Sequence, residues 1–380
     1  MLCTAQPVKA NGVLHAEYMD SVELSLLTCQ PHDEIYSLYG HTAIRLHDLH
    51  RQGEDWAYNY GVFSFDKPFF TLRFVFGLTD YELGVYAFRD FQAEYRYYGS
   101  EVTEQVLNLT REEKMHLIQA LAENMQPENR VYRYNYFYNN CTTKARDIIE
   151  QCIEGRVEYT SRENYHVSYR DMVHAMTQRH PWAAFGNDLL LGVKADLKTD
   201  REEQEFLPNN LMYDFDRAQI YSNGQYRPLV SERHIVVPAG VQMTTTGFPL
   251  SPRVCGWLIG FAGVLLFALE WRRQYIFRWW SIILMTVTAI IGTVLFLMLF
   301  SQHPTVSLNL QFLLFNPLPW FFLWPVARGR GHRYWQLTAI LAVLFFAGGF
   351  IQSYADGISS LALCLLLQST ISLKFWAAKH

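Results

Sequence analysis

Cys141 is the residue whose type and setting most strongly indicate chemistry. It follows two asparagines, where an aromatic predicted strand (Val131–Tyr138) gives way to a predicted helix (Lys144–Cys152). The unpaired N–H groups and the dipole at a helix N-terminus lower the pKa of a thiol, which makes a reactive thiolate accessible near neutral pH. The same N–H groups can hold a developing oxyanion. A cysteine at a helix start can also be a small apolar residue, so position alone leaves both interpretations open.

A thiol nucleophile needs a base, and His41 is the histidine best placed to provide one. It follows Tyr39-Gly40 and begins a short predicted strand (His41–Leu46), which would hold its imidazole rigidly. Asn59, on the next predicted strand (Trp56–Phe65), could orient the imidazole through its other ring nitrogen. The alternative at position 41 is a satisfied core histidine, and the assignment of Asn59 rests on the strand argument alone.

The other cysteines have structural explanations. The six cysteines, at positions 3, 29, 141, 152, 255 and 364, form no CxxC pair, so a zinc site has little support. We expect Cys152 to be buried in packing, whereas Cys29 is either a core residue or a disulfide partner in an oxidising compartment. We predict neither a metal nor an organic cofactor.

The elements that must position these residues form a mixed domain of strands and helices. Alternating or β-branched runs predict strands at Val22–Cys29, His41–Leu46, Trp56–Phe65 and Glu101–Leu109. Thr110 and Glu113 form a capping box that opens a helix. We expect an α+β domain over residues 21–215, preceded by a segment (1–20) whose signal peptide is missing or removed. A linker is expected over residues 216–253.

Charge and hydropathy divide the chain at Arg253. The 380 residues are 50% apolar and only 18% charged, with a net charge of −4. The part from Val254 onward carries +6, so the first 253 residues carry −10. An acidic front half joined to a basic, apolar back half is not one uniform globule. Because phosphate binding needs a basic face, nucleic acid is excluded as a partner of the front half.

The back half is predicted to be a membrane domain over residues 254–380. Its five apolar runs are Val254–Trp271, Trp279–Phe300, Gln311–Ala327, Tyr334–Gln352 and Ile358–Phe375. The third run contains three prolines, so we expect it to be kinked or partly re-entrant. Lys and Arg lie in the first and third connections and at the C-terminus, which places residues 1–253 outside the cytoplasm. A buried, all-helical soluble domain is the alternative.

Three motifs in this order resemble the N-terminal periplasmic domain of Lnb-type lipoprotein N-acyltransferases. They are Tyr39–Arg45 (YGHTAIR), Asn59–Gly61 (NYG) and Tyr136–Thr143 (YFYNNCTT). The resemblance covers roughly residues 20–215, and the five-span region is similar as well. It implies a permuted papain-like fold, related to NlpC-type hydrolases and lecithin:retinol acyltransferase, in which histidine precedes cysteine. Cys141 would then be the nucleophile and His41 the base.

The resemblance also implies a substrate class and a location. The expected enzyme lies in the bacterial inner membrane with its N-terminal domain in the periplasm, among membrane lipids. It would move an acyl chain from a phospholipid donor, through a Cys141 thioester, to the α-amino group of a diacylglyceryl-cysteine lipoprotein. The apolar run Phe69–Phe76 could shape an acyl groove, or it could be a core strand or helix. The candidate substrate-binding residues, for which structural roles are the alternative, are Tyr39, Arg45, Arg73 and Asn140.

Two other functions use the same residues differently. A membrane-tethered cysteine peptidase or amidase acting on cell-wall peptides would employ the same pair, with water as the acyl acceptor. A non-catalytic module that binds lipoproteins or lipids would not need Cys141 at all.

Overall fold

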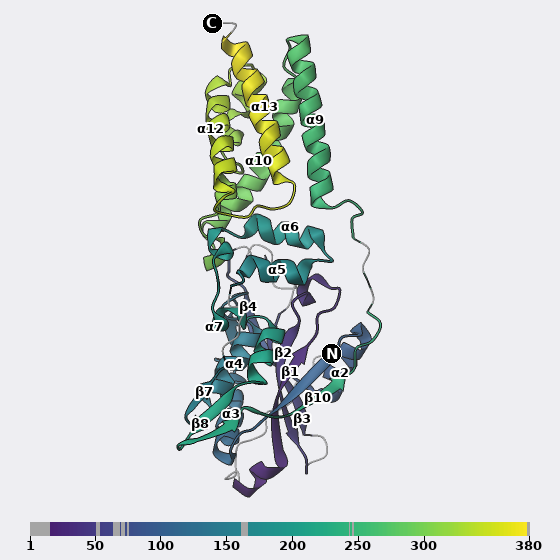
Figure 1. The fold of residues 1–380 in the computed structure, drawn as a ribbon, viewed down its shortest axis with the longest axis vertical. Helices are drawn as coiled ribbons and strands as arrows, with labels where there is room; N and C mark the ends of the chain where they lie inside the picture. The colour runs from purple at the N-terminus through teal and green to yellow at the C-terminus, as the bar shows by residue number, and fades with distance from the viewer. Residues whose placement is uncertain are drawn as a thin grey trace. The chain divides into compact units, whose positions relative to one another are not determined.

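The chain divides into two compact units in the computed structural model (Figure 1). The structure describes residues 16–50, 54–63, 76–160, 166–242 and 247–377, together with Phe69, Arg73 and Thr244. The first unit comprises Met1–Phe74, Leu78–His166 and Thr199–Thr245, and the second comprises Val75–Gly77, Val167–Lys198 and Thr246–His380.

A sheet of seven antiparallel strands forms the centre of the first unit, in the order β10-β5-β1-β2-β3-β4-β6. These strands are β1 (Val22–Cys29), β2 (His41–Asp48), β3 (Asp55–Val62), β4 (Asp80–Ala87), β5 (Val102–Leu107), β6 (Val131–Arg133) and β10 (Val230–Val237). The register pairs Cys29 of β1 with His41 of β2, and Ile44 of β2 with Tyr58 of β3. Since residues on a strand alternate between faces, this register decides which side chains of β2 and β3 can meet.

Helices pack on the sheet through two apolar clusters. The larger cluster joins alternate strand residues such as Leu26 and Ile44 to the helices α3 (Arg111–Asn124), α4 (Cys141–Gln151) and α8 (Pro208–Phe215). The smaller one joins the intervening residues Leu27 and Ala43 to α2 (Phe88–Tyr98). Short helices η1 (Ala16–Ser21), η2 (Ile35–Ser37) and α7 (Arg201–Gln204) complete this unit. The sheet is therefore covered on both faces, which explains why β1 is buried along almost its whole length.

Several predicted elements are confirmed, and others differ in extent. Strand β1 has the predicted bounds, and Thr110 and Glu113 form the predicted capping box of α3. The aromatic strand predicted over Val131–Tyr138 ends at Arg133, because Asn135 and Asn139 exchange backbone hydrogen bonds and close a tight turn. The sequence analysis missed β4 and α2. The left-handed Gly99 (φ +67°) that ends α2 is a recognisable helix-stop signal.

The predicted linker over residues 216–253 is wrong for much of its length. Strands β8 (Gln219–Ser222) and β9 (Gln225–Pro228) pair with β7 (Arg156–Glu158) in a second sheet, and β10 forms an edge of the main sheet. Strand β10 is mostly exposed, so it lacks the apolar alternation that identifies a strand. The turn between β8 and β9 is Asn223-Gly224, both with positive φ, which is a strong hairpin signal.

The second unit is helical. Its C-terminal helices are α9 (Pro252–Arg273), α10 (Arg278–Met298), α11 (Pro319–Ala327), α12 (His332–Gly348) and α13 (Ile358–Ala377), with η4 (Pro304–Val306) and η5 (Leu310–Leu313) between them (Figure 1). Within the described chain, three of these helices, α9, α10 and α13, are long and apolar enough to cross a membrane. The third apolar run, which contains three prolines, is divided between η5 and α11.

Residues 167–198 also belong to the second unit, which the predicted domain over residues 21–215 did not anticipate. They form α5 (Tyr169–Thr177), α6 (Pro181–Leu190) and η3 (Val193–Asp196). The buried Arg170 pairs with Asp188 at 2.6 Å and with Asp196 at 2.9 Å. Gln311 and Gln352 donate hydrogen bonds to the Asp188 and Leu191 carbonyls at the end of α6. These polar contacts join residues far apart in sequence, so no local pattern reveals them.

Glu113 is expected to stabilise the first unit, because this buried carboxylate accepts two hydrogen bonds from Arg227 and one from the Glu154 N–H. Glu113→Gln removes the charge opposite Arg227 and should lower the free energy of unfolding by about 2 kcal/mol. This loss is smaller than the loss expected for a fully buried ion pair, because Arg227 is partly exposed. The unfolding temperature of the full chain in detergent should fall by about 5 °C. The control is Asp20→Asn, which removes an exposed pair with Arg111 and should change that temperature little.

Candidate active site

Asn140 fixes the position of Cys141 at the first residue of α4. The Asn140 side chain accepts hydrogen bonds from the Thr142 and Thr143 N–H groups, at 2.9 and 3.0 Å. Its amide nitrogen donates to the Tyr136 and Phe206 carbonyls, at 3.1 and 2.8 Å. Asn140 is therefore a helix cap that also ties α4 to two other segments. Because the cap occupies two of the N–H groups predicted to hold an oxyanion, the Cys141 N–H is the donor that the cap leaves available.

The helix α4 begins three residues before the predicted start because of this cap. Asn140 and Thr143 form a reciprocal capping box, and Ala145, Ile148 and Ile149 follow on one buried face. The Thr142 hydroxyl lies 3.1 Å from that of Thr42 on β2. This contact and the apolar face hold the N-terminus of α4 against the strand that carries His41.

His41 and Asn59 are hydrogen-bonded to each other. The Nε2 atom of His41 lies 3.1 Å from Oδ1 of Asn59. Asn59 is buried, and its amide nitrogen donates to the Ala57 carbonyl at 3.2 Å, which turns its oxygen toward the imidazole. Nε2 must then carry the proton, since an amide oxygen can only accept. This arrangement leaves Nδ1 of His41 as the unprotonated nitrogen, and the orienting role of Asn59 stays a prediction.

The His41 imidazole and the Cys141 thiol interact directly. Burial raises the pKa of the Cys141 thiol, but the charge of His41 and its hydrogen bond outweigh burial and lower that pKa below the usual value. The Thr42 backbone N–H and the Thr142 hydroxyl lower it further. Burial lowers the pKa of His41, and the Cys141 thiolate together with the hydrogen bond to Asn59 raises it above the usual value. Opposite shifts of this kind favour a thiolate–imidazolium pair.

Tyrosine side chains surround this pair. Burial raises the pKa values of Tyr132, Tyr134 and Tyr136 well above the usual value, and the Cys141 charge adds to each. The hydroxyls therefore stay protonated and can donate hydrogen bonds. Tyr39 stacks edge-on against Tyr136, with ring centroids 4.9 Å apart. The sequence analysis did not single out Tyr132 and Tyr134, although the repeat of tyrosine at every second residue up to position 138 was a visible signal.

Gly61 lies beside the thiol. Its φ is +92°, and a Cβ at this position would lie 3.7 Å from the Cys141 Cβ and 3.9 Å from the Tyr132 hydroxyl, which are ordinary contact distances. The positive φ, rather than a lack of space, is what favours glycine here. Within the NYG motif, Asn59 thus bonds to the His41 imidazole, and Gly61 lies next to Cys141.

Three predicted substrate-binding residues have structural partners instead. Arg45 donates to Asp55 at 2.7 Å and to Glu104 at 3.0 Å, and its guanidinium stacks over a phenylalanine ring. Arg73 pairs with Asp80 at 2.7 Å. The side chain of Asn140 forms the helix cap described above. These partners favour the structural alternative for Arg45, Arg73 and Asn140, and the substrate-binding role of Tyr39 stays a prediction. Most of the predicted acyl groove, Phe69–Phe76, lies outside the described residues.

The remaining described thiols are poor nucleophiles or lie elsewhere. No disulfide joins the described cysteines, and Cys29 and Cys152 are buried. Burial raises the pKa of both. Among the residues that the structure describes, no group of three or more His, Cys, Asp or Glu side chains could hold a metal ion.

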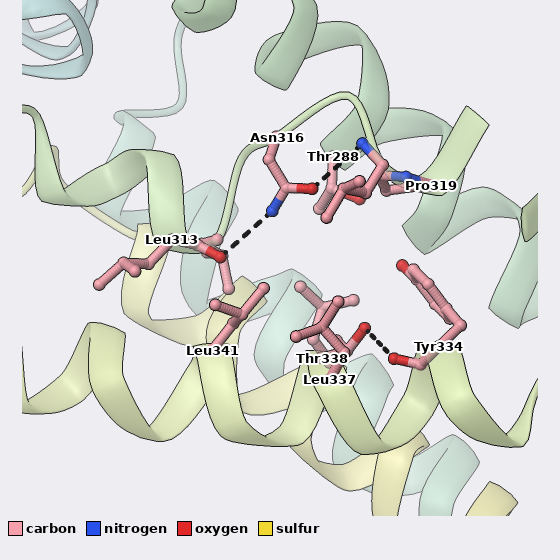
Figure 2. A pocket seen from close by; sticks show the side chains of 11 residues that line it. Thr288, Leu313, Asn316, Pro319, Tyr334, Leu337, Thr338 and Leu341 are labelled. Atoms are coloured by element: carbon pink, nitrogen blue, oxygen red, sulfur yellow. Dashed lines mark hydrogen bonds between the residues drawn. The ribbon is translucent and has the colours of Figure 1, made fainter. Parts of the chain in front are cut away.

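The second unit contains a pocket whose lining side chains differ in type from those around Cys141 (Figure 2). Its polar side chains include Thr288 and Asn316, beside leucines of neighbouring helices. Asn316 and Thr338 bond to nearby backbone groups, as Figure 2 shows. The lining contains hydroxyl, amide and aliphatic groups but no thiol, imidazole or carboxylate, so the Cys141 site is the stronger candidate for catalysis.

A thiol–imidazole–amide site on an α/β unit, joined to helices long and apolar enough to cross a membrane, indicates a membrane-associated protein with a candidate catalytic cysteine. Residues 14–177 match the family model of the Lnb N-terminal periplasmic domain, and residues 243–379 match that of the Lnb transmembrane domain. The chain therefore belongs to the Lnb family, which confirms the resemblance. Membership indicates a membrane-associated, lipoprotein-modifying enzyme with a periplasmic N-terminal domain. No curated protein and no solved structure matches the chain.

The reactivity of Cys141 toward iodoacetamide should depend on His41. As pH rises, alkylation should reach its half-maximal rate below the pH typical of a free thiol, because the pKa of Cys141 is lowered. In His41→Ala, burial acts without the opposing imidazolium, so this midpoint should move to higher pH. Mass spectrometry of the alkylated peptide measures the rate, with Cys152 as the internal, unreactive control. An unchanged midpoint in His41→Ala would show that the two groups are not coupled.

Proposed function

We propose that this protein is a lipoprotein N-acyltransferase of the bacterial inner membrane that works through an acyl thioester on Cys141. The observation that carries the proposal is the interaction of Cys141 with His41, whose imidazole is in turn oriented by Asn59. The match to the two Lnb domains supports both the substrate class and the membrane setting. A permuted papain-like origin agrees with histidine preceding cysteine in the chain.

The first half-reaction transfers an acyl chain to the enzyme. The Cys141 thiolate attacks an ester carbonyl of a phospholipid, while His41 holds the proton that it took from the thiol. The Cys141 N–H stabilises the resulting oxyanion. When the tetrahedral intermediate collapses, the glycerol oxygen leaves with the proton from His41. The products are a lysophospholipid and an acyl thioester on Cys141.

The second half-reaction passes the chain to the lipoprotein. The free α-amino group of a diacylglyceryl-cysteine attacks the thioester carbonyl, and neutral His41 accepts the proton that the amine releases. Collapse of the intermediate forms the amide and expels the Cys141 thiolate beside the His41 imidazolium. The enzyme thus returns to the thiolate–imidazolium state in which it began, and no cofactor is needed for the balance.

The membrane domain gives this reaction its setting. Both the phospholipid donor and the lipoprotein acceptor are held in lipid, so helices that keep the enzyme among membrane lipids raise the local concentration of both substrates. The distribution of Lys and Arg in the connections supports an orientation with the N-terminal domain in the periplasm. The tyrosine hydroxyls around Cys141, including that of Tyr39, are suited to donate to ester or phosphate oxygens of the donor.

Replacement of Cys141 should abolish N-acylation. In Cys141→Ala, a reporter lipoprotein should keep only its two ester-linked chains, which mass spectrometry of its N-terminal peptide detects. A labelled acyl chain should be recovered on Cys141 of the unaltered protein. Cys152→Ala, which removes a buried thiol of the adjacent segment, is the matched control and should retain activity. Full N-acylation by Cys141→Ala would contradict the proposal, and acyl release to water alone would favour a hydrolase.

Asn59 should act by orienting His41 rather than by touching the acyl group. Asn59→Ala removes the acceptor for Nε2–H and should lower kcat by roughly tenfold to a hundredfold, less than the loss of the general base itself. Asn59→Asp keeps an acceptor and should retain more activity than Asn59→Ala. Rates measured with a fixed phospholipid donor compare the two. Equal losses in both variants would assign Asn59 a role in packing only.

A further inference from the structure

Exposed apolar side chains cluster at the end of the sheet where β2 begins. Ile35 is 72% exposed, Tyr36 58%, Tyr97 68% and Val241 93%. We call these four residues the apolar lip. They come from three segments, namely the β1–β2 connection, the end of α2 and the chain that follows β10. Exposed apolar residues that cluster in this way mark a contact surface more often than isolated ones do.

Hydrogen bonds hold the three segments together. The side chain of Gln242 donates to the Pro31 carbonyl at 2.8 Å, and the Gly240 N–H donates to the Gly99 carbonyl at 3.0 Å. Gly99 allows this approach, since a Cβ there would lie 2.6 Å from the Val241 carbonyl oxygen. The backbone at position 241 is thus fixed while its side chain remains in solvent.

Ring contacts order the remaining part of the lip. The His32 ring stacks on Tyr98 with centroids 4.0 Å apart, and Tyr36 packs edge-on against His32 at 5.8 Å. Tyr97 packs against Tyr98 at 5.1 Å. Tyr36 and Tyr97 thus each pack one part of the ring against another aromatic ring and expose the rest to solvent. Aromatic side chains at a membrane–water interface are arranged in this way.

The lip adjoins the candidate active site along the chain. The connection that carries Ile35 and Tyr36 leads through Gly40 into His41, and the Gly40 N–H donates to the Ser37 carbonyl at 3.0 Å. Whatever surface contacts Tyr36 therefore meets the chain five residues before His41.

The chain itself limits how far the lip can lie from a membrane. Ser251, which caps the membrane-spanning candidate α9, lies ten residues after Val241 in the chain. Even fully extended, this stretch reaches at most about 35 Å. Asp33 and Glu34 flank the apolar residues, and the N-terminal part of the chain has a net charge of −10, so attraction to anionic headgroups is not the binding force.

We propose that the apolar lip of Ile35, Tyr36, Tyr97 and Val241 inserts into the interface of the outer leaflet and holds the N-terminal domain on the bilayer. The contact is apolar, so it is insensitive to salt and does not need anionic lipid. This role goes beyond the acyl-transfer reaction, and a failure of that reaction would leave it standing.

Photocrosslinking of the full chain in phosphatidylcholine nanodiscs tests the proposal. p-Benzoylphenylalanine replaces Tyr36 or Tyr97 in the lip, and Tyr226 as a control of comparable exposure on β9. Mass spectrometry should find several-fold more phospholipid adducts at positions 36 and 97 than at 226, at low and high salt alike. Alkylation of Cys141 checks that each variant is folded.

Three results would overturn the proposal. The first is equal lipid labelling at all three positions, and the second is crosslinking of positions 36 and 97 to protein rather than lipid. The third is labelling that needs added phosphatidylglycerol or disappears at high salt, since this would make the contact electrostatic.

Discussion

The side chain of Asn140 is the constraint on which the candidate site depends. It uses both donors and both acceptor positions, two on the first turn of α4 and two on the carbonyls of Tyr136 and Phe206. A buried amide with all of its hydrogen bonds made has one stable orientation, because any rotation leaves polar groups unpaired. The helix start, and with it Cys141, is thereby fixed relative to the aromatic turn before it and to the segment that carries Phe206.

The neighbours of Cys141 and His41 oppose the effect of burial on the charged form of each group. Burial disfavours both the Cys141 thiolate and the His41 imidazolium, whereas each group shifts the pKa of the other toward its charged form. Asn59 completes the arrangement, since its bond to Ala57 turns its oxygen to the imidazole and fixes which nitrogen faces the thiol. Each residue therefore depends on the next, which is why the histidine and the asparagine lie on neighbouring strands of a rigid sheet.

The two parts of the chain differ in net charge and also in the kind of residues that they carry. The basic residues of the second part lie near the ends of apolar helices, whereas the acidic first part carries Cys141. An acidic domain has no electrostatic attraction to an anionic bilayer, so the acyl transfer that we propose requires apolar contact and the chain connection to bring Cys141 to lipid. The apolar lip that we propose as a bilayer contact consists of Ile35, Tyr36, Tyr97 and Val241, none of which is basic.

The sequence alone determined those features that depend on residues close together in the chain. The capping box at Thr110, the apolar runs, the charge division and the three motifs all depend on residues near one another in the chain. Only the tertiary structure decided the partners of Arg45, the strands within residues 216–253 and the place of residues 167–198 in the helical unit. Each of these depends on hydrogen bonds or ion pairs between distant segments, which the register of the sheet and the packing of helices create. An arginine in a strand looks the same in sequence whether a phosphate or a buried carboxylate will face it.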